Sequence, residues 1–226
     1  MRFQAVIFDL DGTLLDSLGG IAAAMNALLD QMGYPLHPLE NYRYFVGAGL
    51  RTMVNRALPG EWHRQFPDAQ QKESRLDRLE EAYRNIYSEK WPLHSSPYPG
   101  IPELLKTLSR LDVNMAVLSN KSEDFTKRMV LALLPGCDFD MVLGARRGVP
   151  VKPDPAAALE IAAALNRTPG EMIFLGDSGV DMQTGVNAEM YPLGALWGFR
   201  DAEELLANGA KQLIKHPLDL IKIMDF

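Results

Sequence analysis

Residues 5–17 read AVIFDLDGTLLDS, and this stretch decides the fold. Its first four residues form a continuous apolar run, which is typical of a strand buried on both faces of a parallel sheet. Asp9 and Asp11 follow at the carboxyl end of that strand, and Gly12 breaks the extended backbone. Ligands of open α/β sheets bind at this edge, so the acid pair suits a Mg²⁺ site with one carboxylate acting as a nucleophile. The alternative is an ordinary turn, because Asp and Gly also favour turns.

Three further segments carry polar side chains, two of them at the end of an apolar run. In chain order they are NMAVLSN (residues 114–120), VKPDP (151–155) and MIFLGDSGVD (172–181). The chain therefore presents an acid pair, a hydroxyl with an amide, a lysine and a second acid pair, in that order.

Short apolar runs alternate with helical patterns after residue 100, which predicts an α/β fold with a Rossmann-like, doubly wound parallel sheet. The expected strands are Ala5–Phe8, Met115–Ser119, Met141–Leu143, Met172–Gly176, Leu193–Trp197 and Gln212–Ile214. The expected helices are Ile101–Leu111, Glu123–Leu134, Pro155–Leu165, Val180–Ala188, Ala202–Ala207 and Leu218–Met224.

Residues 18–96 interrupt this alternation with helical patterns alone. The longest spans Ala69–Trp91, where apolar residues recur every three or four positions along one helix face: Leu76, Leu79, Tyr83, Ile86 and Tyr87. We therefore expect an inserted α-helical domain at 18–96, and a core domain formed by 1–17 together with 97–226.

The four segments resemble the conserved motifs of the haloacid dehalogenase superfamily of phosphatases, which match in order and residue type. Residues 98–105 (YPGIPELL) and 197–200 (WGFR) are also similar to the phosphoglycolate phosphatase-like branch. The resemblance implies a helical cap between the first and second motifs. It also implies a Mg²⁺-dependent phosphatase that acts on a small phosphorylated metabolite through an aspartyl-phosphate.

The resemblance also implies roles for individual residues. Asp9 is the expected nucleophile, and Asp11 the general acid and then the general base. Ser119 and Asn120 would donate hydrogen bonds to the phosphoryl group, and Lys152 would neutralise its charge. Mg²⁺ would be held by Asp9, by the main-chain carbonyl of Asp11 and by Asp177, whereas Asp181 would act through water or by orienting Lys152. For Asp177 and Asp181, capping of the following helix is a compatible alternative.

Gly47 and Arg51 are candidate substrate-binding residues in the expected cap. On the functional interpretation their loop faces the site, and Arg51 meets a substrate carboxylate. On the structural interpretation Gly47 and Gly49 only make a turn between helices. Arg146 and Arg147 precede the lysine segment, where they are either solvated or add to the attraction of anions.

Composition narrows the class of protein. The net charge of −6 argues against a nucleic-acid partner. The single cysteine, Cys137, excludes an internal disulfide, and the four scattered histidines do not favour zinc. A signal peptide and an apolar membrane span are not recognisable, so we expect a cytoplasmic monomer or homodimer.

Two alternatives to the phosphatase stay open. A β-phosphoglucomutase-like phosphotransferase shares all four motifs and differs in its cap. A non-catalytic protein that binds a phosphorylated metabolite is the other, although such proteins are expected to lose a catalytic residue. Two other members of the superfamily fit less well. A 2-haloacid dehalogenase lacks a counterpart of Asp11, and a phosphonate hydrolase needs an additional lysine in the cap, for which this cap offers no clear candidate.

Overall fold

The computed structural model of the protein describes residues 3–66 and 68–224. The chain divides into two compact units. The core unit combines Met1–Asp16 with Ser96–Phe226, and the helical unit is Ser17–Ser95.

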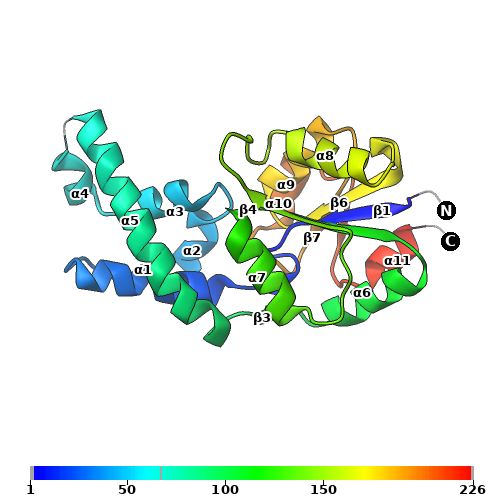
Figure 1. Ribbon diagram of the computed structural model, residues 1–226, viewed down its shortest axis with the longest axis horizontal. Helices are drawn as coiled ribbons and strands as arrows, with labels where there is room; N and C mark the ends of the chain where they lie inside the picture. Colours follow the sequence, from blue (N-terminus) through cyan, green and yellow to red (C-terminus); the bar gives the residue numbers. More distant parts are fainter. Residues whose placement is uncertain (1–2, 67, 225–226) are drawn as a thin grey trace. The chain divides into compact units, whose positions relative to one another are not determined.

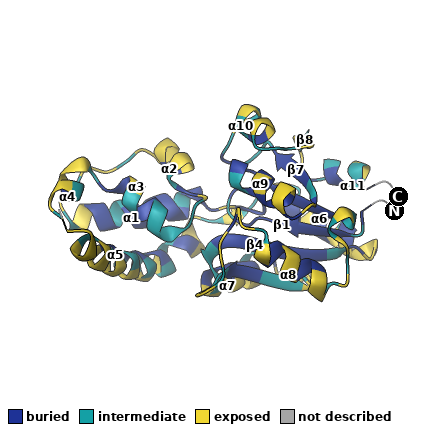
Figure 2. Ribbon diagram, turned by 90° about the horizontal axis from the view of Figure 1, so that it is seen from above, coloured by how far each residue is buried: buried dark blue, intermediate teal, exposed yellow. Residues whose placement is uncertain are grey.

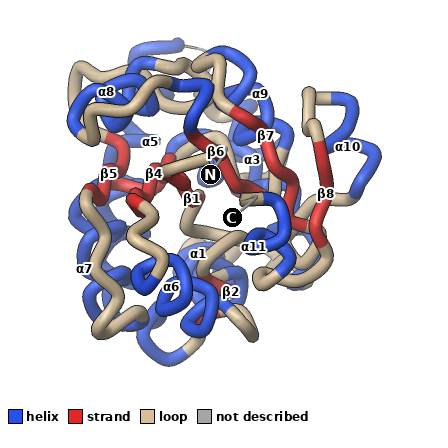
Figure 3. The backbone as a smooth tube through the Cα atoms, turned by 90° about the vertical axis from the view of Figure 1, so that its right-hand side faces the viewer, coloured by secondary structure: helices blue, strands red, loops and turns tan. Residues whose placement is uncertain are grey.

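A parallel sheet forms the centre of the core unit (Figures 1 and 3). Among the described residues it contains six strands in the order β5-β4-β1-β6-β7-β8. The strands are β1 (Ala5–Phe8), β4 (Asn114–Ser122), β5 (Met141–Ala145), β6 (Met172–Gly176), β7 (Tyr191–Ala195) and β8 (Gln212–Ile214). Every residue of β1 and β6 is buried, as the continuous apolar runs predict.

Helices cover both faces of this sheet, with α6 and α7 on one face and α8 and α9 on the other (Figure 3). Their bounds, with those of the two last helices, are α6 (Ile101–Arg110), α7 (Glu123–Leu133), α8 (Ala156–Ala164), α9 (Gly179–Asn187), α10 (Ala202–Ala207) and α11 (Asp219–Ile223). The predicted α/β class, with a parallel sheet and an inserted helical region, is confirmed.

Strand register sets where the polar residues gather. Phe8 at the end of β1 pairs with Val117 of β4 on one side and with Leu175 of β6 on the other. The segments that follow these three strands therefore leave the sheet at a common edge. The Asp9 amide also donates to the Leu175 carbonyl at 2.9 Å, which continues the pairing one residue beyond β1.

Three strands end differently from the prediction. The strand β5 ends at Ala145 instead of Leu143. The strand β4 continues to Ser122, although its pairing with β5 is irregular between Leu118 and Ser122. The strand β7 ends at Ala195 instead of Trp197. The Trp197 indole donates to the Thr13 carbonyl at 3.0 Å, so this residue belongs to a loop that turns toward the end of β1.

The helical unit is built around its first and last long helices, α1 (Leu18–Gln31) and α5 (Ala69–Lys90), which pack together. Between them lie α2 (Leu39–Phe45), α3 (Leu50–Ala57) and α4 (Gly60–Arg64), and the short η1 (Trp91–Leu93) follows α5. Of the face predicted on α5, Leu76, Tyr83 and Tyr87 are buried, while Leu79 and Ile86 are half-buried.

The chain leaves and re-enters the core unit through a pair of short strands, β2 (Leu15–Asp16) and β3 (Ser96–Pro97). They pair antiparallel, with Leu15 opposite Pro97 and Asp16 opposite Ser96. Among the described residues, no helix combines the length and the apolar character needed to cross a lipid bilayer.

The helix α8 offers a matched test of this packing, because it has both buried and exposed positions (Figure 2) and carries one large aliphatic residue of each kind. Ile161 is fully buried in the core between α8 and the sheet, whereas Leu159 is 41% exposed. We expect Ile161→Ala to lower the free energy of unfolding by about 2–5 kcal/mol, because it leaves a cavity. Leu159→Ala is expected to cost about 1 kcal/mol or less. Urea unfolding followed by circular dichroism measures both, and equal losses would contradict the described orientation of α8.

Candidate active site

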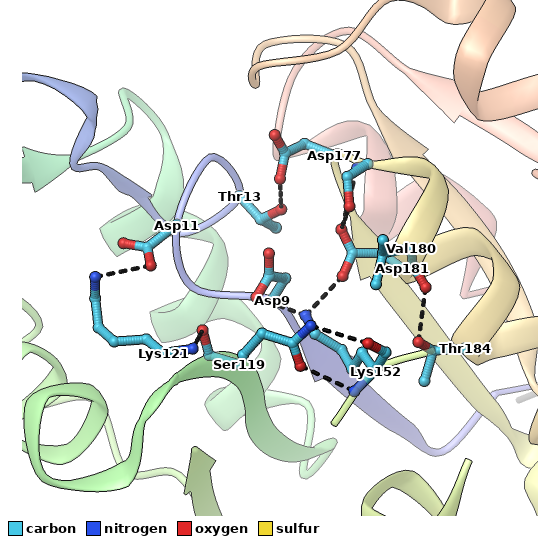
Figure 4. A network of polar contacts seen from close by, with 12 residues as sticks. Asp9, Asp11, Thr13, Ser119, Lys121, Lys152, Asp177, Val180, Asp181 and Thr184 are labelled. Atoms are coloured by element: carbon cyan, nitrogen blue, oxygen red, sulfur yellow. Dashed lines mark hydrogen bonds and ion pairs between the residues drawn. The ribbon is translucent and has the colours of Figure 1, made fainter. Parts of the chain in front are cut away.

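Four segments of the core unit bring polar side chains together at the common edge of the sheet (Figure 4). Asp9 follows β1 and Asp177 follows β6, while Ser119 lies near the end of β4. Lys152 comes from the loop between β5 and α8. The side chains of Asp9, Ser119, Lys152 and Asp177 are all buried, so the predicted motifs form one cluster in space.

Lys152 lies at the centre of the charged groups. Its Nζ atom is 2.8 Å from Asp9 Oδ1 and 2.7 Å from Asp181 Oδ1. The ammonium also lies 5.7 Å from the centre of the Phe174 ring. One buried cation therefore links the acid that follows β1 to an acid in the first turn of α9.

The carboxylates of this cluster carry more negative charge than Lys152 balances. Burial raises the pKa of Asp9 to about 7, the charge of Asp181 adds to the increase, and Lys152 opposes it. Burial and the charges of Asp181 and Asp9 likewise raise the pKa of Asp177 well above its usual value. For Lys152, burial would lower the pKa, but Asp181 and Asp9 raise it above its usual value. A further cation at this place would relieve the excess negative charge.

Asp177 is held by neutral donors and enclosed by glycines. The Thr13 hydroxyl donates to its Oδ1 at 3.0 Å, and the Phe199 amide donates to its Oδ2 at 2.7 Å. A Cβ atom at Gly12 would lie 2.2 Å from Asp177 Oδ2, and one at Gly198 would lie 2.2 Å from Asp177 Cβ. Gly12 also has φ of +91°, which side chains other than glycine rarely adopt. Two loops thus fix the position of this carboxylate.

Asp181 both caps α9 and contacts Lys152. Its Oδ2 accepts hydrogen bonds from the Ser178 amide at 3.0 Å and the Ser178 hydroxyl at 2.6 Å, and the first of these bonds belongs to the capping box of α9. Its Oδ1 is the atom that contacts Lys152. The capping role and a role in the charged cluster are therefore compatible in the same side chain.

The residues fit a divalent cation. Asp9, Asp177 and Asp181 are buried, and each offers a carboxylate oxygen within 4.8 Å of the others. Such a hard oxygen set suits Mg²⁺, and a dication would offset the unbalanced negative charge. The sequence predicted Asp9, Asp11 and Asp177 as ligands, with Asp11 contributing its main-chain carbonyl.

The Asp11 side chain forms an ion pair with Lys121. Its Oδ2 lies 2.9 Å from Lys121 Nζ, and both side chains are mostly buried. In Figure 4 this pair lies on one side of Asp9, and Asp177, Asp181 and Lys152 lie on the other. The two acids of the first motif therefore face different cations.

Asn120, predicted to bind the phosphoryl group, forms two hydrogen bonds with the main chain of Lys152. Its side-chain amide donates to the Lys152 carbonyl at 3.0 Å, and its oxygen accepts from the Lys152 amide at 2.9 Å. On the other side of this loop, the Asn187 side chain donates to the Pro153 carbonyl at 2.9 Å. The Ser119 hydroxyl accepts a hydrogen bond from the Lys121 amide at 3.2 Å.

Gly47 and Arg51 belong to the helical unit. Gly47 lies in the loop between α2 and α3 with φ of +105°, which fits a tight turn. The Arg51 guanidinium forms ion pairs with three carboxylates of α5, those of Glu73, Asp77 and Glu80. One cation here faces three anions, which makes Arg51 a poor partner for a further carboxylate.

Arg146 also has protein partners, because it pairs with Glu160 of α8 and lies 3.5 Å from Glu123 of α7. Arg147 is exposed. The structure thus ties Arg146 to two helices of the core unit.

Three contributors to the cluster were not predicted from the sequence: Thr13, Lys121 and the Phe199 amide. Thr13 lies within the first quoted stretch and Lys121 directly follows residues 114–120, so their positions were the available signal. The role of Phe199 rests on a main-chain N–H, which leaves no signal in side-chain type.

The chain is similar to known proteins over nearly its whole length. The family model described as haloacid dehalogenase-like hydrolase matches residues 6–195. A phosphoglycolate phosphatase of Psychrobacter arcticus is 32% identical over 205 residues, covering 91% of this chain and 88% of that protein. One from Aquifex aeolicus is 28% identical and covers 98% of this chain and 97% of its own. A crystal structure from Lactobacillus delbrueckii subsp. bulgaricus, provisionally named a phosphoglycolate phosphatase, has a TM-score of 0.87 at 29% identity and covers 99% of both chains.

Binding of Mg²⁺ to this site is expected to stabilise the folded protein. At a concentration about 100-fold above the dissociation constant, the gain is about 2.7 kcal/mol, which raises the melting temperature. We expect Asp177→Asn to abolish this shift, because it removes a buried carboxylate of the candidate site. Asp138→Asn removes an exposed carboxylate and should keep the shift. Differential scanning calorimetry with and without Mg²⁺ measures it, and an unchanged shift in Asp177→Asn would place the cation elsewhere.

Proposed function

This chain belongs to the haloacid dehalogenase-like hydrolase family, and we propose that it is a Mg²⁺-dependent phosphatase that hydrolyses a small organic phosphomonoester through a phosphorylated Asp9. The observation that carries the proposal is the buried Lys152 ammonium between Asp9 and Asp181, next to Asp177. Phosphoryl transfer depends mainly on such charge neutralisation and positioning.

Asp9 is the proposed nucleophile because its carboxylate is held in one orientation and is partly exposed to solvent. Lys152 holds its Oδ1, which limits rotation of the carboxylate. The Asp9 side chain keeps 11% of its surface exposed, whereas the Asp181 side chain keeps 1%. Of the two acids that contact Lys152, Asp9 is therefore the one that a substrate can reach.

The reaction we propose has two displacements. In the first, an Asp9 carboxylate oxygen bonds to phosphorus while the ester P–O bond breaks, and Asp11 gives its proton to the leaving oxygen. In the second, water bonds to phosphorus, Asp11 takes the proton from that water, and the bond between phosphorus and Asp9 breaks. The products are the alcohol and inorganic phosphate, and both acids return to their starting state.

The other residues hold charge and geometry in this scheme. Bound Mg²⁺ would supply positive charge to the phosphoryl oxygens. Lys152 would neutralise a phosphoryl oxygen as well as Asp9, and Ser119 would donate a hydrogen bond from its hydroxyl. Asp181, with one oxygen bound to Ser178 and the other to Lys152, is proposed to orient the lysine. Asn120 is proposed to fix the main chain from which Lys152 projects.

The proposed substrate class comes from the relatives. Proteins of similar length named phosphoglycolate phosphatase match nearly the whole chain. We therefore propose 2-phosphoglycolate as the first substrate to test, within the wider class of small phosphomonoesters.

Inorganic phosphate release from a panel of phosphomonoesters tests the proposed function. We expect release with Mg²⁺, no release with EDTA, and no detectable turnover by Asp9→Asn, which has lost its nucleophile. Asp138→Asn serves as the matched control. Circular dichroism verifies that both variants are folded. A folded Asp9→Asn variant that retains turnover would overturn the nucleophile, and an isomerised sugar phosphate without free phosphate would favour the mutase.

Lys152→Met is expected to lower kcat by at least about 100-fold, because it removes a buried cation from the reacting groups. It also leaves Asp9 and Asp181 without their shared partner, so its stability must be checked. Lys127→Met, which removes an exposed lysine of α7, is the control. Single-turnover and steady-state assays measure the loss, and a folded Lys152→Met variant with less than a tenfold loss would make the lysine structural.

A further inference from the structure

Lys121 places a second lysine in the candidate site, on the side of Asp9 away from Lys152 (Figure 4). It belongs to β4, two residues after Ser119, and the fold holds it on the same sheet edge as Asp9. Its side chain is only 10% exposed, and its Nζ lies 2.9 Å from Asp11 Oδ2. The ion pair therefore joins β4 to the loop after β1.

We propose that Lys121 recognises an anionic group on the leaving part of the substrate and so selects phosphomonoesters whose alcohol carries a carboxylate. The inference rests on the proposed phosphatase function and on the placement of Asp11 as the group that protonates the leaving oxygen. It names a specificity-determining residue for that reaction, on a side chain outside the four motifs.

The covalent geometry of 2-phosphoglycolate limits the distance between its leaving oxygen and its carboxylate. An acid that protonates the leaving oxygen must lie within hydrogen-bond distance of it. In 2-phosphoglycolate a single CH₂ group separates that oxygen from the carboxylate, whose oxygens lie at most about 4 Å from it. An ammonium that contacts Asp11 is therefore within reach of the substrate carboxylate as well.

The charge of Lys121 suits this role. A lysine ammonium has three N–H donors and can donate hydrogen bonds to an enzyme carboxylate and a ligand carboxylate at the same time. Because Lys121 and Asp11 are both mostly buried, solvent screens their surroundings less than it screens a surface lysine. Arg51 is the competing candidate for a substrate carboxylate, but three anions of α5 already surround it.

The test compares two substrates that differ only where Lys121 would act. 2-Phosphoglycolate carries a carboxylate, and 2-hydroxyethyl phosphate carries a neutral CH₂OH group at the same position. We expect the unmodified protein to prefer 2-phosphoglycolate in kcat/KM. Lys121→Met should lower that preference by about 10- to 100-fold, the range of a hydrogen bond to a charged group. Lys121→Arg should keep most of it, and Lys127→Met should leave it unchanged.

Each outcome decides a different point. If Lys121→Met slows both substrates equally, the lysine only positions Asp11, and the proposal is wrong. If the unmodified protein shows no preference for the carboxylate, the proposal is also wrong, and this result does not depend on any variant folding. If Arg51→Ala removes the preference while Lys121→Met keeps it, recognition belongs to Arg51. If the unmodified protein releases phosphate from neither substrate nor from any other phosphomonoester, the proposed function itself fails.

Discussion

The ion pairs of the buried Lys152 ammonium with Asp9 and Asp181 are the contacts on which the rest of the site depends. Buried charges are costly unless they are paired, so three acids and one lysine must be held in a fixed arrangement. The surrounding chain supplies that arrangement. Asn120 binds the main chain of Lys152, Ser178 binds Asp181, and the loop at Phe199 binds Asp177. The sheet contributes by ending β1, β4 and β6 at the same edge.

Much of the fold follows from simple patterns in the sequence. The strands β1, β6 and β8 have the predicted bounds. For β1 and β6, which are buried throughout, a short apolar run flanked by polar residues leaves little freedom in where the strand ends. The end of β7 was predicted two residues late, since Leu196 and Trp197 continue the apolar run in sequence. In the structure the chain turns there, and the Trp197 indole binds the Thr13 carbonyl. A contact between residues so far apart leaves no local signal.

In the candidate site, too, the sequence predicted the motif residues better than it predicted their partners. The motifs singled out Asp9, Ser119, Lys152 and Asp177, which the structure brings together. The partners of these residues were harder to predict, because an amide such as Asn120 has the same chemistry whether it faces a ligand or the main chain. In the helical unit, the ion pairs of Arg51 join α3 to α5. Charged residues on exposed helix faces carry no periodic signal for their partners, so Arg51 was assigned from its residue type and its place after the glycine loop.

The pairing of β2 with β3 has a consequence for how such proteins diversify. Asp16 lies opposite Ser96, so the polypeptide departs from the sheet-bearing unit and returns to it at neighbouring points. An insertion with adjacent ends can be lengthened, shortened or exchanged for a homologous cassette without changing the strand order around Asp9. Evolution can therefore vary the inserted helices as a module while the reaction centre is inherited intact.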